Sequence, residues 1–185
     1  MKKNLRVAPN DLNSQTIQII QLESKRAAEI CTLINEAYSE IQQIFFGDLP
    51  RTDIEQVMSV FKTGLWIGAC DESDMLVGVA ALEVKSTVRF LLSNLSVLPR
   101  ARSAGIGDAL ESEALLISQK RDAKFLEQLV VGRKHGECLY SQKLRQKAIK
   151  NNYCFIKKSD FESVYPARSD SQRLPLIVYF FELAI

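Results

Sequence analysis

The chain has 185 residues, of which 46% are hydrophobic and 25% are charged, and its net charge at pH 7 is +2. This length suits one domain and leaves too little room for two full ones, and the composition is that of a soluble globular protein. A chain of this kind can bury a core of its own without disulfide or metal crosslinks.

The first part of the chain predicts one strand and two helices. Residues 16–22 (TIQIIQL) alternate well enough for a half-buried strand. Ser24 can cap a helix that continues to residue 45, because apolar side chains recur there every three or four positions. Thr52 with Glu55 forms a capping-box pattern that opens a short helix ending near residue 61. Its expected inward side chains are Ile54, Val57, Met58 and Phe61.

The rest of the chain mixes strands and helices. The expected elements are strands at 65–70, 75–84 and 88–97, a helix at 105–120, a strand at 125–131, a basic helix at 137–150, a short strand at 153–157, a polar loop at 162–173 and a strand at 176–184. Polar residues between the first two of these strands are typical of a hairpin, and Pro99 ends the third. Hairpins beside strand–helix alternation predict a mixed α/β sheet rather than a doubly wound parallel one.

Residues 120–158 are strongly basic, with eleven lysines or arginines against three acidic residues. Such a stretch is compatible with a nucleic-acid-binding surface, a solvated helix face or a binding surface for a phosphate-rich cofactor. Nucleic-acid binding is the least favoured, because few aromatic residues are interspersed. They are Phe125, Tyr140, Tyr153 and Phe155.

The four cysteines, Cys31, Cys70, Cys138 and Cys154, include no CxxC pair. This spacing argues against a zinc site and a disulfide framework, and it favours reduced thiols in a cytosol. The first residues, MKKNLRVAPNDLNSQ, lack the apolar region of a signal peptide, and no apolar run reaches the length of a membrane span. We therefore expect a cytoplasmic protein that does not enter a membrane and holds no metal.

Two glycines, Gly105 and Gly107, open the helix predicted at 105–120, directly after an apolar strand and a loop that carries Arg102. A G-x-G pair alone is weak, but free N–H groups at a helix start suit a phosphate group. Glycines let the main chain approach that phosphate closely, and Arg102 adds a charged side chain. The dinucleotide fingerprint fails because Leu110 stands at its third glycine, and the P-loop fails because Asp108 and Ala109 follow Gly107.

The segment from Leu95 to Gly107, LSVLPRARSAGIG, resembles motif A of the GNAT superfamily of N-acetyltransferases, with its (Gln/Arg)-x-x-Gly-x-(Gly/Ala) signature. The order of predicted elements is also similar, so the resemblance covers about residues 16–185. It implies one domain over residues 1–185, in which we expect 1–15 to be a flexible or loosely packed arm. It also implies a central, mostly antiparallel sheet that is splayed at a cofactor cleft and flanked by helices.

The resemblance implies acetyl-CoA as the cofactor and a primary amine as the acceptor, which attacks directly in a ternary complex. Main-chain groups of Leu95 and Val97 would pair with the pantetheine arm, as an added strand would. The strands at 88–97 and 125–131 would splay, and an N–H there would steady the oxyanion of the reaction. The pyrophosphate would be held by amides of Arg102, Ser103, Ala104, Gly105, Ile106 and Gly107.

The catalytic base departs from the family pattern. Many members carry a carboxylate on or near the motif A strand, but residues 90–97 (FLLSNLSV) contain none. The nearest candidates are Glu83 on the preceding strand and Glu127 on the following one, each of which is otherwise a solvated strand residue. Asn94 could position a water for a relayed deprotonation, although it is no base.

The general acid of the family is a tyrosine in the penultimate helix, in a (Phe/Leu)-Tyr pair five residues before a Gly-(Phe/Tyr) ending. Leu139-Tyr140 matches the pair, but the nearest ending, Asn152-Tyr153, comes thirteen residues after Tyr140. Either this helix is about two turns longer than usual or Tyr140 is displaced. In the second case Tyr140 would simply pack the helix start.

Three further features have open roles. His135 in the loop after the strand at 125–131 could shuttle a proton or be a solvated histidine. Trp66 belongs either to the core or to a cleft wall. The loop at 165–173 should lie near the acceptor entrance, where Arg168, Asp170 and Arg173 would select a charged acceptor or face water.

Two other functions compete with the enzyme. One is an acyl-CoA-binding sensor or interaction module that has kept the cleft without the catalytic groups. The other is a nucleic-acid-associated protein that uses the basic helix. The residues do not choose among amine acceptors, whether small molecules or peptides. The apolar C-terminus, LIVYFFELAI, would support a homodimer through strand exchange or a shared sheet.

Overall fold

The computed structural model describes residues 3–6, 16–47, 49–136, 138–166, 168, 172 and 174–185. Eight strands from these ranges form one sheet in the order β1-β2-β3-β4-β5-β6-β8-β7. They are β1 (Lys3–Arg6), β2 (Thr16–Gln21), β3 (Gly64–Cys70), β4 (Leu76–Val84), β5 (Arg89–Val97), β6 (Phe125–Arg133), β7 (Cys154–Asp160) and β8 (Leu176–Ala184). Every neighbouring pair is antiparallel except β5 and β6, which confirms the predicted mixed sheet.

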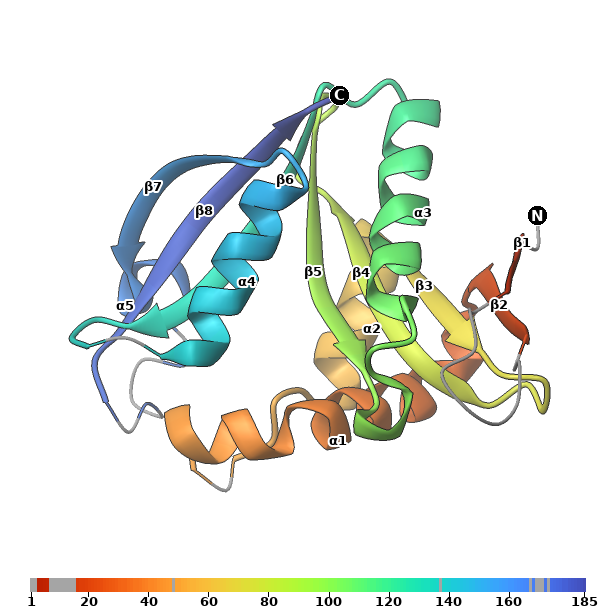
Figure 1. Ribbon diagram of the computed structural model, residues 1–185, viewed down its shortest axis with the longest axis horizontal. Helices are drawn as coiled ribbons and strands as arrows, with labels where there is room; N and C mark the ends of the chain where they lie inside the picture. Colours follow the sequence, from red (N-terminus) through yellow and green to blue (C-terminus); the bar gives the residue numbers. More distant parts are fainter. Residues whose placement is uncertain are drawn as a thin grey trace.

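Helices cover both faces of this sheet (Figure 1). They are α1 (Ala27–Phe45), α2 (Ile54–Thr63), α3 (Ile106–Lys120), α4 (Leu139–Lys150) and α5 (Phe161–Val164), with 3-10 turns η1 (Ser24–Arg26) and η2 (Pro99–Ala101). In Figure 1, α3 and α4 stand in front of the sheet, and α2 lies behind it. No helix within the described ranges is both long and apolar enough to cross a membrane.

Two clusters of buried side chains fix the helices to the sheet. On the α3 face, Leu110 and Ala114 of α3 pack with Leu92 of β5 and Leu126 of β6. On the other face, α1 and α2 pack against β3 and β4 in a second cluster that includes Trp66. The core reading of Trp66 is confirmed, because its side chain is fully buried and its indole N–H donates to the Val57 carbonyl at 3.1 Å.

The caps of the first two helices differ from the prediction. Ser24 lies inside η1, and the N-cap of α1 is Arg26, whose guanidinium binds the Glu29 carboxylate at 2.7 and 2.8 Å. The N-cap of α2 is Asp53 rather than Thr52, because the Asp53 carboxylate accepts from the Gln56 N–H at 2.8 Å.

The inward face of α2 differs as well. Val57 and Val60 are buried, whereas Ile54 and Met58, which were expected inward, are 52% and 37% exposed. Phe61 is partly buried against the α1–α2 cluster, so the buried stripe follows positions i, i+3 and i+4 from Val57.

Two described elements were not expected from the sequence. Lys3–Arg6 form β1, which pairs with β2, while the other residues of the predicted arm at 1–15 lie outside the described ranges. Phe161–Val164 form the short helix α5 at the start of the predicted polar loop. The C-terminal strand β8 lies between β6 and β7 and is therefore paired on both of its edges.

The parallel pair of β5 and β6 is short. The two strands pair only from Arg89 opposite Phe125 to Leu92 opposite Gln128. Figure 1 shows them side by side near the C-terminus and then diverging toward α1. This divergence opens the sheet between its two halves, and it confirms the splay that was expected between these two strands.

Candidate active site

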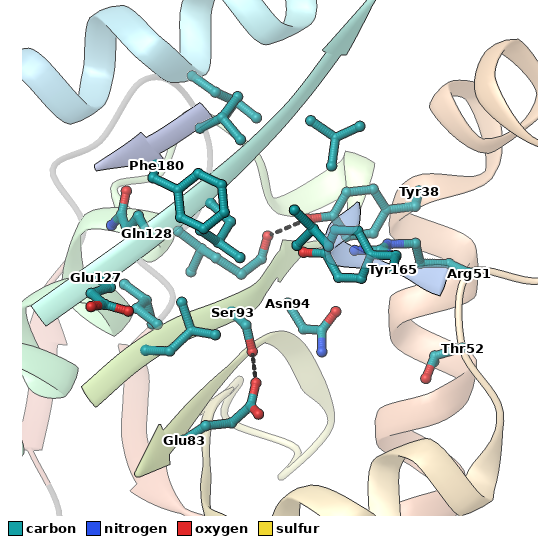
Figure 2. A pocket seen from close by; sticks show the side chains of 18 of the residues that line it. Tyr38, Arg51, Thr52, Glu83, Ser93, Asn94, Glu127, Gln128, Tyr165 and Phe180 are labelled. Atoms are coloured by element: carbon teal, nitrogen blue, oxygen red, sulfur yellow. Dashed lines mark hydrogen bonds between the residues drawn. The ribbon is translucent and has the colours of Figure 1, made fainter. Parts of the chain in front are cut away.

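A cavity of about 620 Å³ occupies the space between the diverging strands. Its walls include residues 93–95 of β5 and 129–131 of β6, beyond the point where their pairing ends. Figure 2 shows the rings of Tyr38, Tyr165 and Phe180 on the opposite side of the view from Glu83. Apolar walls with a few converging polar groups are typical of a small-molecule site.

A β-bulge on β5 lies at this cavity. Ser93 is opposite Ala81 and Ser96 is opposite Val79, so two residues of β5, Asn94 and Leu95, face a single residue of β4. Asn94 adopts a left-handed conformation with φ of 48°, which asparagine tolerates better than most residues. The bulge interrupts the ladder and turns main-chain groups of this segment toward the cavity.

Leu95 and Val97 occupy different parts of this strand. Leu95 lines the cavity, and its carbonyl accepts a hydrogen bond from the Tyr38 hydroxyl at 3.0 Å. The Leu98 N–H donates to Val77 of β4 at 3.0 Å, so the main-chain groups of Val97 point to the opposite edge of β5. That edge is the one that has separated from β6.

The N-terminus of α3 lies at the end of β5 and is open. Its N-cap, Gly105, has a φ of 74°, and a Cβ added there would meet nothing within 4 Å. The Ala109 N–H donates to the Gly105 carbonyl at 3.0 Å, so the amides of residues 106–108 have no acceptor within the helix. Unpaired amides at the positive end of a helix dipole form a site for an anion.

The Arg102 side chain is directed toward the protein. Its guanidinium donates to the Ala37 carbonyl of α1 at 2.7 Å and to the Val97 carbonyl at 3.3 Å. These bonds tie the loop before α3 to α1, so the side chain stabilises the shape of the loop.

Lys147 of α4 supplies a positive charge at the first turn of α3. Its ammonium group lies 2.7 Å from the Asp108 carboxylate and 3.6 Å from the position that a Cβ on Gly107 would occupy. One residue of the basic stretch at 120–158 therefore lies beside the helix start that was expected to hold a pyrophosphate. With the open amides and the cavity, this arrangement fits the phosphates and pantetheine arm of coenzyme A.

Tyr140 lies in the first turn of α4 and lines the cavity. Burial raises its pKa well above the ordinary value, and the neighbouring Tyr38, to which it is hydrogen bonded, adds to the rise. Since the single hydroxyl proton of Tyr38 is directed to Leu95, Tyr38 accepts the hydrogen bond from Tyr140. The two tyrosines thus form a short chain that ends on the bulged strand.

Glu83 and Glu127 both line the cavity, but their surroundings differ. The Glu83 carboxylate accepts from the Ser93 hydroxyl at 2.7 Å (Figure 2) and from the Lys85 ammonium group at 2.9 Å. The Glu127 carboxylate accepts from the Arg89 guanidinium at 2.9 Å. Glu83 is held by Ser93 of the strand that lines the cavity, whereas Glu127 is tied to Arg89, so Glu83 is the better placed of the two.

Three lining residues were not identified from the sequence. Glu111 of α3 is only 7% exposed and accepts from the amides of Gln128 and Asn151, each at 3.0 Å. Tyr38 matches the apolar stripe of α1, so its periodicity predicted only a core position. Arg51 lies in the connection between α1 and α2, where no sequence pattern distinguishes it from a solvated residue.

The remaining residues predicted from the sequence differ in whether they line the cavity. His135 is exposed in the loop after β6 and does not line the cavity described above. Tyr165 and Arg168 do line it, which places the described part of the 165–173 loop at the site. Asp170 and Arg173 lie outside the described residues.

Comparisons with known proteins give a likeness in structure only. No protein-family model matches the chain, and a search of curated proteins finds no match. A proposed acetyltransferase from Acinetobacter baylyi superposes with a TM-score of 0.69 at 15% identity, over 94% of this chain and 95% of that one. A GNAT-family acetyltransferase from Staphylococcus aureus gives 0.64 at 17% identity, over 90% and 99%. An aminoglycoside 6'-N-acetyltransferase complexed with coenzyme A gives 0.66 at 13% identity, over 90% and 96%.

These superpositions span nearly the full length of each chain. The protein therefore has the fold of the GNAT acyl-CoA N-acyltransferases, as the segment from Leu95 to Gly107 led us to expect. At these identities the likeness establishes the fold, and the activity must be argued from the site itself.

Proposed function

We propose that this protein is an N-acetyltransferase that moves the acetyl group of acetyl-CoA to a primary amine by direct attack in a ternary complex. The observation that carries the proposal is the cleft between β5 and β6, which has an anion site at the α3 N-terminus beside it and a carboxylate and a tyrosine in its walls. The family resemblance and the shared fold support the same conclusion.

Main-chain groups would hold the cofactor. The open edge of β5 at Leu95 and Val97 is suited to pairing with the amides of the pantetheine arm. The amides of residues 103–107 before and in the first turn of α3, with Lys147 beside them, are suited to the pyrophosphate, whereas the Arg102 N–H already donates to the Pro99 carbonyl at 3.3 Å. The guanidinium group of Arg102 would act indirectly, by holding the loop in the conformation that presents those amides.

Glu83 would receive the proton of the attacking amine. A protonated amine has a pKa near 10.4, so it must lose a proton before its nitrogen can attack. The Glu83 carboxylate, held by Ser93 at the bulge, is an acceptor for that proton, either directly or through a water positioned with Asn94. Glu127 is the weaker candidate because it is already hydrogen bonded to Arg89, which it shares with Glu182.

Tyr140 would supply the proton for the departing sulfur. Acetyl-CoA provides a thioester, and as the new N–C bond forms the C–S bond breaks and leaves a thiolate. Because burial keeps the Tyr140 hydroxyl protonated, it can turn from Tyr38 and donate to that sulfur atom. The proton that the amine nitrogen loses as it becomes an amide would then restore the Tyr140 hydroxyl. An amide N–H of the bulge at Asn94–Leu95 would stabilise the oxyanion of the attacked carbonyl.

A catalytically idle acyl-CoA sensor of the same fold is the second candidate. It is favoured by the absence of any carboxylate on residues 93–95 of β5 and by the two partners that already engage Glu83. The sensor and the enzyme would share the cofactor site and differ only in turnover.

Two measurements test the proposal in sequence. The melting temperature should rise with millimolar acetyl-CoA and not with an equal concentration of ATP, since a ligand that binds only the folded state stabilises it. Absence of a rise would refute the cofactor site. A panel of primary amines, followed by release of free thiol, then tests catalysis. Binding of acetyl-CoA with no turnover of any amine would favour the sensor.

A further inference from the structure

One of the charged side chains that line the cavity has no hydrogen-bond or ion-pair partner among the described residues. Seven charged side chains line the cavity: Arg51, Glu83, Lys85, Glu111, Glu127, Lys147 and Arg168. In the described part of the chain, six of them have a hydrogen-bond or ion-pair partner. The Arg51 side chain alone has none there, and its guanidinium lies over the aromatic ring of Tyr38 instead.

We propose that Arg51 binds a carboxylate of the acceptor, so that the acceptor is an amine that also carries a carboxylate, as an amino acid or a short peptide does. This inference rests on the proposed N-acetyltransferase function and names the substrate class of the same site. A guanidinium is the side chain best suited to a carboxylate, because its parallel N–H groups match the two oxygens.

Arg51 is held in place for this role. Its guanidinium carbon lies 5.3 Å from the centre of the Tyr38 ring. Its main-chain carbonyl accepts from Arg168 at 2.7 Å, and the next residue, Thr52, donates its N–H to Asn35 of α1 at 3.0 Å. The connection is thus anchored on both sides, and Figure 2 shows the Arg51 side chain extending toward the rings of Tyr38 and Tyr165.

Arg51 and Glu83 provide opposite charges around Tyr165. Burial raises the pKa of Tyr165, the Arg51 charge opposes that rise and the Glu83 charge adds to it, so both charges act on one hydroxyl. An amine placed at Glu83, where the proposed reaction needs it, would therefore have a guanidinium nearby for a carboxylate. The ammonium group of the acceptor would then lie next to Glu83, and its carboxylate next to Arg51.

The acids of the cavity argue against a polycationic acceptor. Glu127 is engaged by Arg89, and Glu111 by two side-chain amides and by Lys147 at 3.6 Å. Among the acids that line the cavity in the described chain, this leaves Glu83, whose partners are Ser93 and Lys85, as the carboxylate for the reacting amine. A second ammonium group on the acceptor would find no carboxylate of its own and would be repelled by Arg51.

The walls near Arg51 suit an apolar side chain. A hollow of about 80 Å³ adjoins the main cavity and shares Tyr38, Arg51 and Tyr165 with it. Phe45, Phe46 and Phe161 also line this hollow. An amino acid or peptide with an apolar side chain would bury it there while Arg51 holds the carboxylate.

The test is equilibrium binding of matched acceptors to the full chain saturated with coenzyme A, measured by calorimetry. The pairs are leucine with leucinamide and the dipeptide leucyl-leucine with its C-terminal amide; spermidine and phosphoethanolamine serve as polycationic and phosphate-bearing amines. We expect the carboxylate member of at least one pair to bind about tenfold or more tighter than its amide, because the amide lacks the charge-assisted bond to Arg51. Spermidine and phosphoethanolamine should bind more weakly than that carboxylate.

Two variants assign the preference to Arg51. Arg51→Met should bring the acid and amide of a pair to within about twofold of each other, while Arg51→Lys should retain part of the difference. Arg121→Met, which removes the same charge from an exposed position after α3, should leave the preference unchanged.

Several results would overturn the inference. One is equal affinity for the acid and the amide in both pairs, and another is no binding by any member of the panel. A third is tighter binding of spermidine or phosphoethanolamine than of the carboxylates. The fourth is that Arg51→Met lowers the affinity for the acid and for the amide of a pair by the same factor. The rise in melting temperature with acetyl-CoA is measured separately on the same proteins. Its absence would refute the proposed function, whereas its presence with no carboxylate preference would refute only the substrate class.

Discussion

Replacing Gly105 by alanine tests the anion site at α3, and the chain provides a matched control in Gly136. Both glycines have a φ of 74°, and at both a Cβ would meet nothing within 4 Å. The left-handed conformation costs an alanine about 1–2 kcal/mol at either position, so both variants should melt about 2–8 °C lower than the parent. Gly105 is the N-cap of α3 and adjoins its open amides, whereas Gly136 lies in the loop after β6, away from any helix start described as open.

The two variants should therefore differ in their response to acetyl-CoA. The parent should gain about 2.7 kcal/mol of stability at a ligand concentration of 100 Kd, a rise of about 5–11 °C. Loss of one charge-assisted bond to a phosphate weakens binding by about 1.5–3 kcal/mol, which removes about half of that gain or more in Gly105→Ala. Gly136→Ala should keep the full rise on its lower baseline.

Thermal denaturation followed by circular dichroism, with and without acetyl-CoA, measures both effects in one experiment. A full ligand-induced rise in Gly105→Ala would refute the placement of the pyrophosphate at this helix start. An equal loss of the rise in Gly136→Ala would show that strain, and not the position of the methyl group, weakens binding.

Three further predictions concern Tyr140 of the cavity, the cavity acids Glu83 and Glu127, and Tyr153 of the core. Tyr140→Phe should lower kcat by about 100-fold or more, the usual contribution of a positioned acid, while the acetyl-CoA-induced rise in melting temperature stays intact; unchanged turnover would exclude Tyr140 from proton transfer. Glu83→Gln should lower kcat/KM by a similar factor and Glu127→Gln should have little effect, since Glu127 is already engaged by Arg89; equal losses would contradict the assignment of the base. Burial raises the pKa of Tyr153, so the unfolded chain releases this proton near pH 10 while the folded chain retains it, and stability should fall as the pH rises above about 10. Tyr153→Phe should make the melting temperature less steeply dependent on pH between 10 and 11, and an unchanged slope would count against a buried, neutral Tyr153.

The sequence predicted the parts of the fold that depend on local patterns. The glycines at 105 and 107, the proline after β5 and the alternation of the strands are each visible within a few residues. The cap of α2 shows the limit of such signals, because Thr52 and Asp53 are adjacent and both residue types are preferred N-caps. The contact of the Asp53 carboxylate with the Gln56 N–H, which decides between them, is visible only in the folded chain.

The site was predictable where it uses the main chain and obscure where it uses distant side chains. The spacing of one short motif led us to Leu95, which lines the cavity, and to the loop from 102 to 107, whose role in holding the cofactor stays a prediction. Tyr38 and Arg51 come from the α1 region and reach the cavity only because that region packs across the bulged strand. The ion pair between Glu127 and Arg89 likewise depends on the parallel pairing of β5 with β6, and no local sequence pattern encodes the register of that pairing.

The cofactor site proposed here consists mostly of amides, and this has a consequence for the history of such proteins. Every residue except proline presents an N–H, so natural selection at this site acts on backbone conformation and leaves most side chains free to drift. What must persist is a residue that tolerates a φ of 74° at position 105 and a strand that breaks its pairing after Leu92. A site of this kind can persist while the sequence around it diverges, and at 10–17% identity it is the fold that this chain shares with its structural neighbours.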